Sequence, residues 1–498
     1  MYKFQNEKLN VLGNKSITYF NGKNLENKLY EYSNYKRRFY VDTVFNFLEN
    51  SSKRCVELFG LRRVGKTVSI FHIIDKLIKS NVSSNEILYI ECNESLSVDS
   101  LVLFIENMNS KNKLKYEFID EVTEIDDFIS SANNLIEMKI PVKTILTGSS
   151  SLVFYYSKQY LLGRCLKINP TYISYKEWYY LKGGSIFDYI KNAGILDNLI
   201  STEEYIQDAV SYNIQSSLKK YSDIERSIGD LDLRVLDLIN CYDTIIVKST
   251  ELFTNRFELE SIKSKFESFN VNYSNSKYLE KSIFTKTEIY KYIAEKLNDD
   301  YNVDSLTQND VRLLLSLLVK GDFYYKLINR NIIDGYTIDE ERYCSTQPSI
   351  RYKQFVKQKD ILQNSLGVGN DINVENIVEG NILEDTIRLN IDRALPSEYF
   401  KSFHLRIDNL IEIDSVIKNM ETNKVILVEI KRKKNYSKAD FRWLVSEDIT
   451  NYVHGNIVKR LYLYNGKTIK VDYNDTVIDC INIEEFLLSI DTYIDYLY

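Results

Sequence analysis

Residues 54–170 alternate between short apolar runs and longer stretches in which apolar residues recur at helical spacing. Such alternation predicts buried parallel strands joined by helices that cover the sheet. We therefore expect an α/β core over residues 46–170, preceded by a polar and aromatic lead-in over residues 1–45. The expected strands are residues 56–59, 87–90, 116–119 and 144–146.

The pattern changes after this core, since apolar residues keep a helical spacing from residue 171 to about residue 330. This spacing predicts a helical lid or linker region, which we assign to residues 171–370. Near its end, Thr307 can cap a helix that Gly321 would end. Two interpretations stay open for this helix, a winged-helix arrangement and an ordinary capped helix pair.

Strand-like runs return beyond residue 375, at residues 404–407, 411–417 and 425–431. They predict a second α/β module over residues 375–498. The expected fold class is therefore α/β, with an N-terminal parallel sheet, a helical middle region and a C-terminal α/β domain.

A glycine-rich segment follows the first expected strand. Residues 59–67 read FGLRRVGKT and fit the phosphate-binding pattern G-x-x-x-x-G-K-[ST], the Walker A motif of P-loop proteins. Glycines at both fixed positions let successive backbone N–H groups point at phosphate oxygens, at the start of a helix whose dipole favours an anion. We expect ATP to be bound by Gly60, Arg63, Val64, Gly65, Lys66, Thr67 and Val68, with Lys66 on the β and γ phosphates and Thr67 on Mg²⁺.

Two adjacent acids follow the expected strand at residues 116–119. Asp120 would lie at the carboxyl edge of the sheet near Mg²⁺, and Glu121 would polarise the attacking water. After the next strand, Thr147 and Ser149 would lie close to the γ-phosphate, although a Ser/Thr-rich turn is equally well explained as a helix cap.

The C-terminal module contains a second set of carboxylates. Asp414 is followed fifteen positions later by Glu429 and then Lys431, which is the D…ExK pattern of metal-dependent nucleases. Alternation along a strand puts Glu429 and Lys431 on one face. Asp414 and Glu429 would hold Mg²⁺, and Lys431 would orient water and stabilise negative charge. The basic run at residues 431–434 would either neutralise DNA phosphates or be a solvated strand end.

Taken together, the motifs resemble the prokaryotic AAA-type ATPases that carry a C-terminal restriction-endonuclease-like domain of the PD-(D/E)xK type. Besides the glycine-rich loop, the resemblance rests on FIDEV at 118–122, LTGSSS at 146–151, LGR at 162–164, Pro170 and SYKE at 174–177.

The resemblance implies roles for two further residues. Arg164 would be a finger or sensor for the γ-phosphate, the alternative being a solvent-exposed arginine. Glu384, on an expected helix, would add an acid to the nuclease-like metal site. The chain departs from the family at Thr123, where a glutamine is common, and at Ser415, where a phenylalanine is common.

Bulk composition narrows the remaining choices. Lys and Arg total 64 against 70 Asp and Glu, so a net charge of −6 argues against a protein that coats nucleic acid nonspecifically. The six cysteines contain no CxxC pair, and the three histidines, His72, His404 and His454, are too scattered to predict a histidine metal site. No signal peptide or membrane span is expected, so we expect a cytoplasmic protein without a membrane partner.

Two functional hypotheses follow. The first is an ATP-hydrolysing enzyme, with Mg²⁺ as cofactor, whose C-terminal domain binds or cuts DNA; whether it acts as a monomer or as a homo-oligomer stays open. The second is an ATP-dependent regulatory switch whose nuclease-like domain is an inactive scaffold for protein interactions.

Overall fold

The computed structural model describes residues 9–11, 15–125, 128–137, 141–149, 165–194, 196, 291, 294–295, 307–353, 355–356, 374–408 and 411–498. These residues form two compact units. The first contains the described residues up to 172, those at 194–196 and those at 291–322. The second contains residues 173–193 and the described residues from 323 onward.

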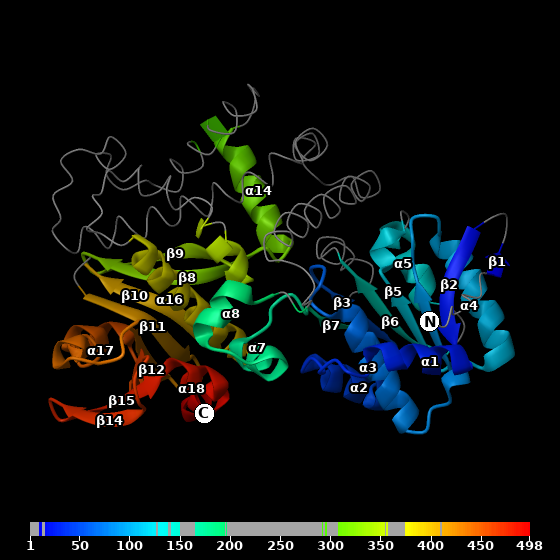
Figure 1. Cartoon of the computed structure of the whole chain (residues 1–498). Helices are drawn as coiled ribbons and strands as arrows, with labels where there is room; N and C mark the ends of the chain where they lie inside the picture. The colour runs from blue at the N-terminus through cyan, green and yellow to red at the C-terminus, as the bar shows by residue number, and fades with distance from the viewer. Residues whose placement is uncertain are drawn as a thin grey trace. The chain divides into compact units, whose positions relative to one another are not determined.

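A seven-stranded sheet forms the centre of the first unit (Figure 1). Neighbouring strands from β4 to β7 in this sheet run parallel, whereas β1 and β2 are antiparallel additions at the β4 edge. The predicted parallel sheet is therefore present, but the lead-in predicted over residues 1–45 needs correction, because it supplies the strands β1 and β2 of this sheet. In spatial order the strands are β1 (Leu9–Val11), β2 (Lys15–Asn21), β4 (Ile87–Glu91), β5 (Tyr116–Asp120), β6 (Lys143–Gly148), β3 (Cys55–Phe59) and β7 (Cys165–Ile168).

Helices bury their apolar faces against this sheet. In α3, Ile70, Ile73, Ile74 and Leu77 are fully buried, and Lys76 and Lys79 in the last turn interact favourably with the helix dipole. Among the described residues of the unit, the helical elements are α1 (Gly22–Tyr32), α2 (Tyr40–Asn50), α3 (Lys66–Lys79), η1 (Ser84–Glu86), α4 (Val98–Asn112), η2 (Val122–Glu124), α5 (Phe128–Ile136) and α14 (Gln308–Lys320).

The second unit is built on an eight-stranded mixed sheet. Strands β10, β11 and β12 form an antiparallel meander, and β13 then pairs parallel with β12. In spatial order the strands are β14 (Ile469–Tyr473), β15 (Thr476–Asn482), β13 (Asn456–Tyr464), β12 (Lys424–Ile430), β11 (Ile411–Asn419), β10 (Phe400–Ile407), β8 (Tyr324–Ile333) and β9 (Tyr336–Ser345).

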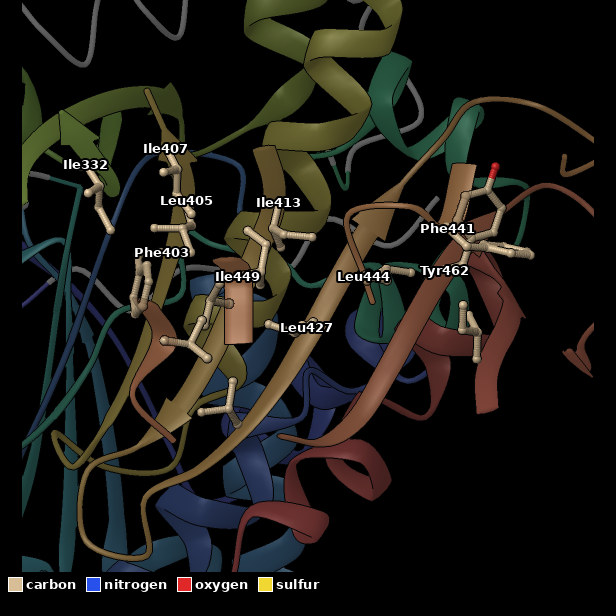
Figure 2. Packing of buried hydrophobic residues seen from close by; sticks show 14 of the residues in the cluster. Ile332, Phe403, Leu405, Ile407, Ile413, Leu427, Phe441, Leu444, Ile449 and Tyr462 are labelled. Atoms are coloured by element: carbon tan, nitrogen blue, oxygen red, sulfur yellow. The ribbon is translucent and has the colours of Figure 1, made fainter. Parts of the chain in front are cut away.

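One hydrophobic cluster holds this sheet together (Figure 2). Leu405 of β10, Ile413 of β11 and Leu427 of β12 are fully buried in it, together with Ile449 of α17 and Tyr462 of β13. Removing this much apolar surface from water is the main stabilising contribution to the unit.

The helices of the second unit come from distant parts of the chain. The elements α7 (Tyr175–Lys182) and α8 (Ile186–Asn192) follow the first unit in sequence but pack on α18 and α16, and the Tyr175 N–H donates to Oδ1 of Asn390 at 2.9 Å. The remaining helical elements are α16 (Val374–Ala394), η4 (Lys438–Phe441), α17 (Glu447–Val453), α18 (Ile483–Leu488), α19 (Ile490–Ile494) and η5 (Asp495–Leu497).

The expected helical region over residues 171–370 needs one correction. Residues 324–345 form the hairpin β8–β9, which extends the sheet of the second unit. Helical periodicity missed it because a long hairpin whose outer strand is largely exposed carries only a weak apolar pattern. The helix predicted after Thr307 is present as α14, and Gly321 follows its last residue. Among the described helices, none combines the length and the apolar character needed to cross a bilayer.

Candidate functional site

The glycine-rich loop connects β3 to α3 in the first unit. Arg63 and Gly65 have φ values of 64° and 85°, the left-handed conformation that turns successive N–H groups inward. A Cβ atom on Gly60 would lie 2.7 Å from Oγ1 of Thr171, so only glycine fits there. The Leu61 N–H donates to that same oxygen at 3.0 Å.

Lys66 is buried at the first position of α3, where its Nζ atom donates to the carbonyl oxygens of Gly60 at 3.1 Å and Leu61 at 2.9 Å. Burial lowers the pKa of Lys66, and the nearby Glu121 and Asp120 oppose that shift. The ammonium group is therefore held by loop carbonyls, with Oε1 of Glu121 4.0 Å away.

Asp120, at the end of β5, is the centre of a buried network of hydroxyl groups. Its Oδ2 atom accepts hydrogen bonds from Thr67 and Tyr89, each at 2.8 Å, and Oδ1 accepts one from Thr147. Thr147 reaches Asp120 because β6 lies between β3 and β5 in the sheet. Burial, reinforced by Glu121, raises the pKa of Asp120.

Glu121 follows directly and has a φ of 53°, an unusual conformation for a residue with a side chain. Its N–H donates to Oγ1 of Thr147 at 3.1 Å, and its Oε2 atom is buried without a hydrogen-bond partner in the described part of the chain. Backbone strain and an unpartnered carboxylate oxygen beside a buried lysine are typical of functional sites.

The other residues predicted for this site fall as follows. Val68 lies in the first turn of α3, and Ser149 is buried directly after β6, whose last residue accepts from the Gly60 N–H at 3.3 Å. Thr123 is buried in η2. Arg164 lies outside the described residues, so its predicted role is untested.

Two residues that the sequence gave no reason to place here also hold the site. Tyr89 of β4 contributes a hydroxyl to Asp120, as given above. Arg38 is buried and donates to the carbonyl oxygen of Val64 in the loop, and to that of Pro170 at 3.2 Å. Neither side chain belongs to a contiguous motif, and only the folded sheet brings them to the loop.

In the second unit, Asp414, Glu429 and Lys431 converge. Nζ of Lys431 forms ion pairs with Oδ2 of Asp414 at 3.3 Å and with Oε1 of Glu429. The Ile430 N–H also donates to Oδ2 of Asp414, at 2.6 Å. Both carboxylate side chains are buried, so this is a compact carboxylate–lysine site.

The charges in this site perturb one another. Burial, with Asp414 close by, raises the pKa of Glu429 to about 8. Burial would lower the pKa of Lys431, but Asp414 and Glu429 raise it well above its ordinary value. Two carboxylates forced together with one lysine favour any additional cation that reaches them.

The remaining predicted residues of this module lie around the site. Glu384 is half-buried on α16 and close enough to raise the pKa of Lys431 further. In the basic run, Arg432 is paired with Glu379, and Lys433 lies 2.6 Å from Asp440. With Lys431 held by Asp414 and Glu429, three of the four residues of that run are therefore paired with carboxylates of the same unit.

The comparisons with known proteins bear on the first unit. Residues 52–179 match a family model described as an AAA domain, and this stretch includes β3, the glycine-rich loop, Asp120 and Thr147. Over these residues the chain is therefore similar to AAA domains. The match ends before the carboxylate–lysine site. No curated protein matches the chain in sequence.

Several solved structures are similar to parts of the chain. A Walker-type ATPase of Pyrococcus abyssi is 12% identical, with a TM-score of 0.30, over 63% of this chain and 94% of that one. The ORC2 protein of Aeropyrum pernix is 11% identical, with a TM-score of 0.27, over 69% and 94%. At these scores the structures carry no argument about substrate or partner.

Proposed function

We propose that this chain is a Mg²⁺-dependent ATP hydrolase. The observation that carries the proposal is the meeting of Lys66, Thr67 and Asp120 at one edge of the sheet, in a domain similar to AAA domains. The side chains fit MgATP, because the loop offers inward N–H groups, a buried ammonium group, and a hydroxyl already bonded to a carboxylate.

Each residue has a task in this proposal. Lys66 gives up its hydrogen bonds to the carbonyl oxygens of Gly60 and Leu61 and binds phosphate oxygens instead. Thr67 and Asp120 orient the ligands around Mg²⁺. These two residues would hold Mg²⁺, which would supply neutralisation of the phosphate charge. Glu121 positions and deprotonates the attacking water. Thr147 donates to the Asp120 carboxylate and accepts from the Glu121 N–H, so it fixes the positions of these two residues. Ser149 would sense the γ-phosphate.

Arg164 completes the proposed hydrolytic site, either in its own subunit or in a neighbouring one. In the second case the enzyme acts as a homo-oligomer, because an arginine supplied in trans needs an adjacent copy.

For the second unit we propose a restriction-endonuclease-like domain that binds and cuts DNA with Mg²⁺. Support comes from the antiparallel strands β11 and β12, which present Asp414, Glu429 and Lys431 together, with Glu384 nearby. The carboxylates would hold the metal, which polarises the scissile phosphate. Lys431 would orient water and stabilise the developing charge.

The ATPase proposal is tested with Lys66→Ala. Phosphate release from MgATP should fall to background, whereas Lys79→Ala, an exposed lysine at the other end of α3, should behave as the parent protein does. A folded Lys66→Ala protein that hydrolyses ATP at the rate of the parent protein would contradict the assignment.

The nuclease proposal is tested with supercoiled plasmid, Mg²⁺ or Mn²⁺, and ATP. The parent protein should nick or linearise the plasmid, and Lys431→Ala should not. Lys434→Ala, an exposed lysine of the same basic run, is the matched control. Absence of cutting by the parent under every condition would favour the alternative, an ATP-dependent switch with a scaffold domain.

A further inference from the structure

A β-bulge shapes the sheet of the second unit next to the carboxylate–lysine site. Phe403 of β10 pairs with Val416 of β11, and Leu405 pairs with Ile413, so His404 alone lies opposite both Asp414 and Ser415. Bulges re-aim side chains and are frequent beside functional sites. This one brings a histidine next to a carboxylate that the sequence had placed with Glu429 and Lys431.

Three potential metal ligands meet at the bulge. His404, Glu412 and Asp414 each offer one ligand atom, and these atoms all lie within 4.8 Å of one another. Nε2 of His404 is 2.6 Å from Oε1 of Glu412. One nitrogen and two carboxylate oxygens at such separations can close around a single cation with small side-chain adjustments.

The hydrogen bonding of this cluster is incomplete. His404 is only 5% exposed, and its Nδ1 atom has no hydrogen-bond partner in the described part of the chain. The buried Oε2 atom of Glu429 also has no hydrogen-bond partner in the described part of the chain. Buried polar atoms are normally satisfied, so an imidazole that pairs with Glu412 through Nε2 and leaves Nδ1 unpartnered is an exception that a bound ligand would explain.

The cations nearby do not complete it. Arg406 contacts Oε1 of Glu412 at 3.4 Å. Lys431 contacts Oδ2 of Asp414 but also pairs with Glu429, so its single charge is shared between two carboxylates. A divalent ion would replace the His404–Glu412 contact and satisfy both carboxylates at once.

We propose that His404, Glu412 and Asp414 bind a divalent transition-metal ion, at a site separate from the Mg²⁺ position proposed between Asp414 and Glu429. Imidazole nitrogen favours transition metals over Mg²⁺, which prefers oxygen ligands and several waters. Asp414 then joins two cations. A role of this ion in DNA cleavage rests on the proposed function of the second unit, whereas binding of the ion does not.

The test uses the nucleotide-free full chain and Mn²⁺ as the probe. Mn²⁺ titration followed by electron paramagnetic resonance gives affinity and stoichiometry, and the electron spin-echo signal detects a nitrogen ligand on bound Mn²⁺. The parent protein should show nitrogen modulation. His404→Asn should lose that modulation and one bound Mn²⁺, with the affinity at this site weakened about tenfold or more.

Glu412→Gln is the second variant, and it should weaken the same binding step even if His404→Asn folds poorly. His454→Asn is the matched control, because His454 is exposed in the same unit and should leave binding unchanged. A parent protein without nitrogen modulation, or folded variants that bind Mn²⁺ as the parent does, would overturn the site. Lys431→Ala should retain the nitrogen signal, so a failure of the nuclease proposal is recorded separately.

Discussion

The two units satisfy their buried carboxylates in different ways. In the first unit, Asp120 accepts hydrogen bonds from the hydroxyl groups of Thr67, Tyr89 and Thr147. Glu117 accepts one from the hydroxyl group of Thr144 at 2.6 Å. Glu57 is the exception, since Lys167 lies 2.8 Å from it.

In the second unit, cationic side chains, not hydroxyl groups, bond to the buried carboxylates. Asp385 is bonded by Arg342 at 2.6 and 2.8 Å and by Arg351 at 2.5 Å, and Arg388 lies 3.9 Å away. Burial would raise the pKa of Asp385, but these arginines hold it far below its ordinary value.

The difference has a functional consequence. Burial raises the pKa of Asp120, and its hydroxyl partners only partly offset that rise because they carry no positive charge, so the site gains from a cation that arrives with a nucleotide. At Asp385, cationic side chains cancel that charge in advance, whereas at the carboxylate–lysine site a single lysine faces two carboxylates and leaves charge for one further cation. Four substitutions can break or sharpen this contrast.

The largest effect is expected for Asp385→Asn. Loss of the carboxylate removes the shared partner of two buried arginines, Arg351 and Arg388, and of the partly exposed Arg342, so the free energy of unfolding of the second unit should fall by about 3–5 kcal/mol. Urea unfolding followed by tryptophan fluorescence measures this unit alone, because Trp178 and Trp443 both lie in it.

Asp339→Asn is the control for that measurement. Asp339 forms a two-bond pair with Arg330 that is similar in geometry but exposed, so its loss should cost about 1 kcal/mol or less. Equal losses for both variants would show that burial does not set the strength of these pairs.

Asp120→Asn should come next. The change keeps the shape of the side chain but removes the charge that faces the metal, so ATP hydrolysis should fall about a thousandfold while the first unit stays folded. Phosphate release is the measurement. Asp75→Asn, on the exposed surface of α3, is the control. A folded Asp120→Asn protein with undiminished hydrolysis would contradict the metal-binding role.

Glu117→Gln tests the charge of a fully buried carboxylate for which the described part of the chain offers a hydroxyl partner, Thr144, and no ion pair. Burial raises the pKa of Glu117 from 4.5 to about 7, so the folded state holds a proton that the unfolded state releases between these values. The free energy of unfolding should therefore fall as the pH rises from 4.5 to 7. At pH 8 the glutamine should stabilise the first unit by about 3 kcal/mol relative to its effect at pH 4.

Hydrogen exchange of peptides covering β5, compared between variant and parent at each pH, measures this effect. Glu86→Gln is the control, because Glu86 is on the surface beside Lys115 and its pKa is lowered. A Glu117→Gln effect that is independent of pH would show that the carboxyl group stays in one protonation state.

Tyr89→Phe should have the smallest effect. It removes one of three hydroxyl donors to Asp120, which should lower the stability of β4 and β5 by about 1 kcal/mol and reduce hydrolysis only modestly. Hydrogen exchange in both strands is the measurement, with the exposed Tyr30→Phe as the control. An effect as large as that of Asp120→Asn would mean that Tyr89 acts on the nucleotide directly.

Several elements could be predicted because their information is local. The strands β3, β4, β5 and β6 and the helix α3 lie where the apolar runs placed them. The proximity of Asp120 to Thr67 was expected because the carboxyl ends of parallel strands share one edge of a sheet. The D…ExK residues also meet as expected.

Other features had no local signal. Helical spacing did not reveal the hairpin β8–β9, and nothing near Arg38 or Tyr89 in the sequence points to the loop that they support. His404 was set aside because three scattered histidines do not predict a metal site, yet a bulge of β11 aligns it with Asp414.

By itself, the sequence determined the glycine-rich loop, the strands β3, β4, β5 and β6 with the helix α3 of the first unit, and which carboxylates belong to each module. Spacing along the chain fixes these features because they depend on backbone conformation and on side-chain alternation over a few residues. Only the tertiary structure decided which hydroxyl, arginine or histidine partners each carboxylate. Those partners come from strands and helices far apart in sequence, and sheet register, including a single bulge, sets their distances.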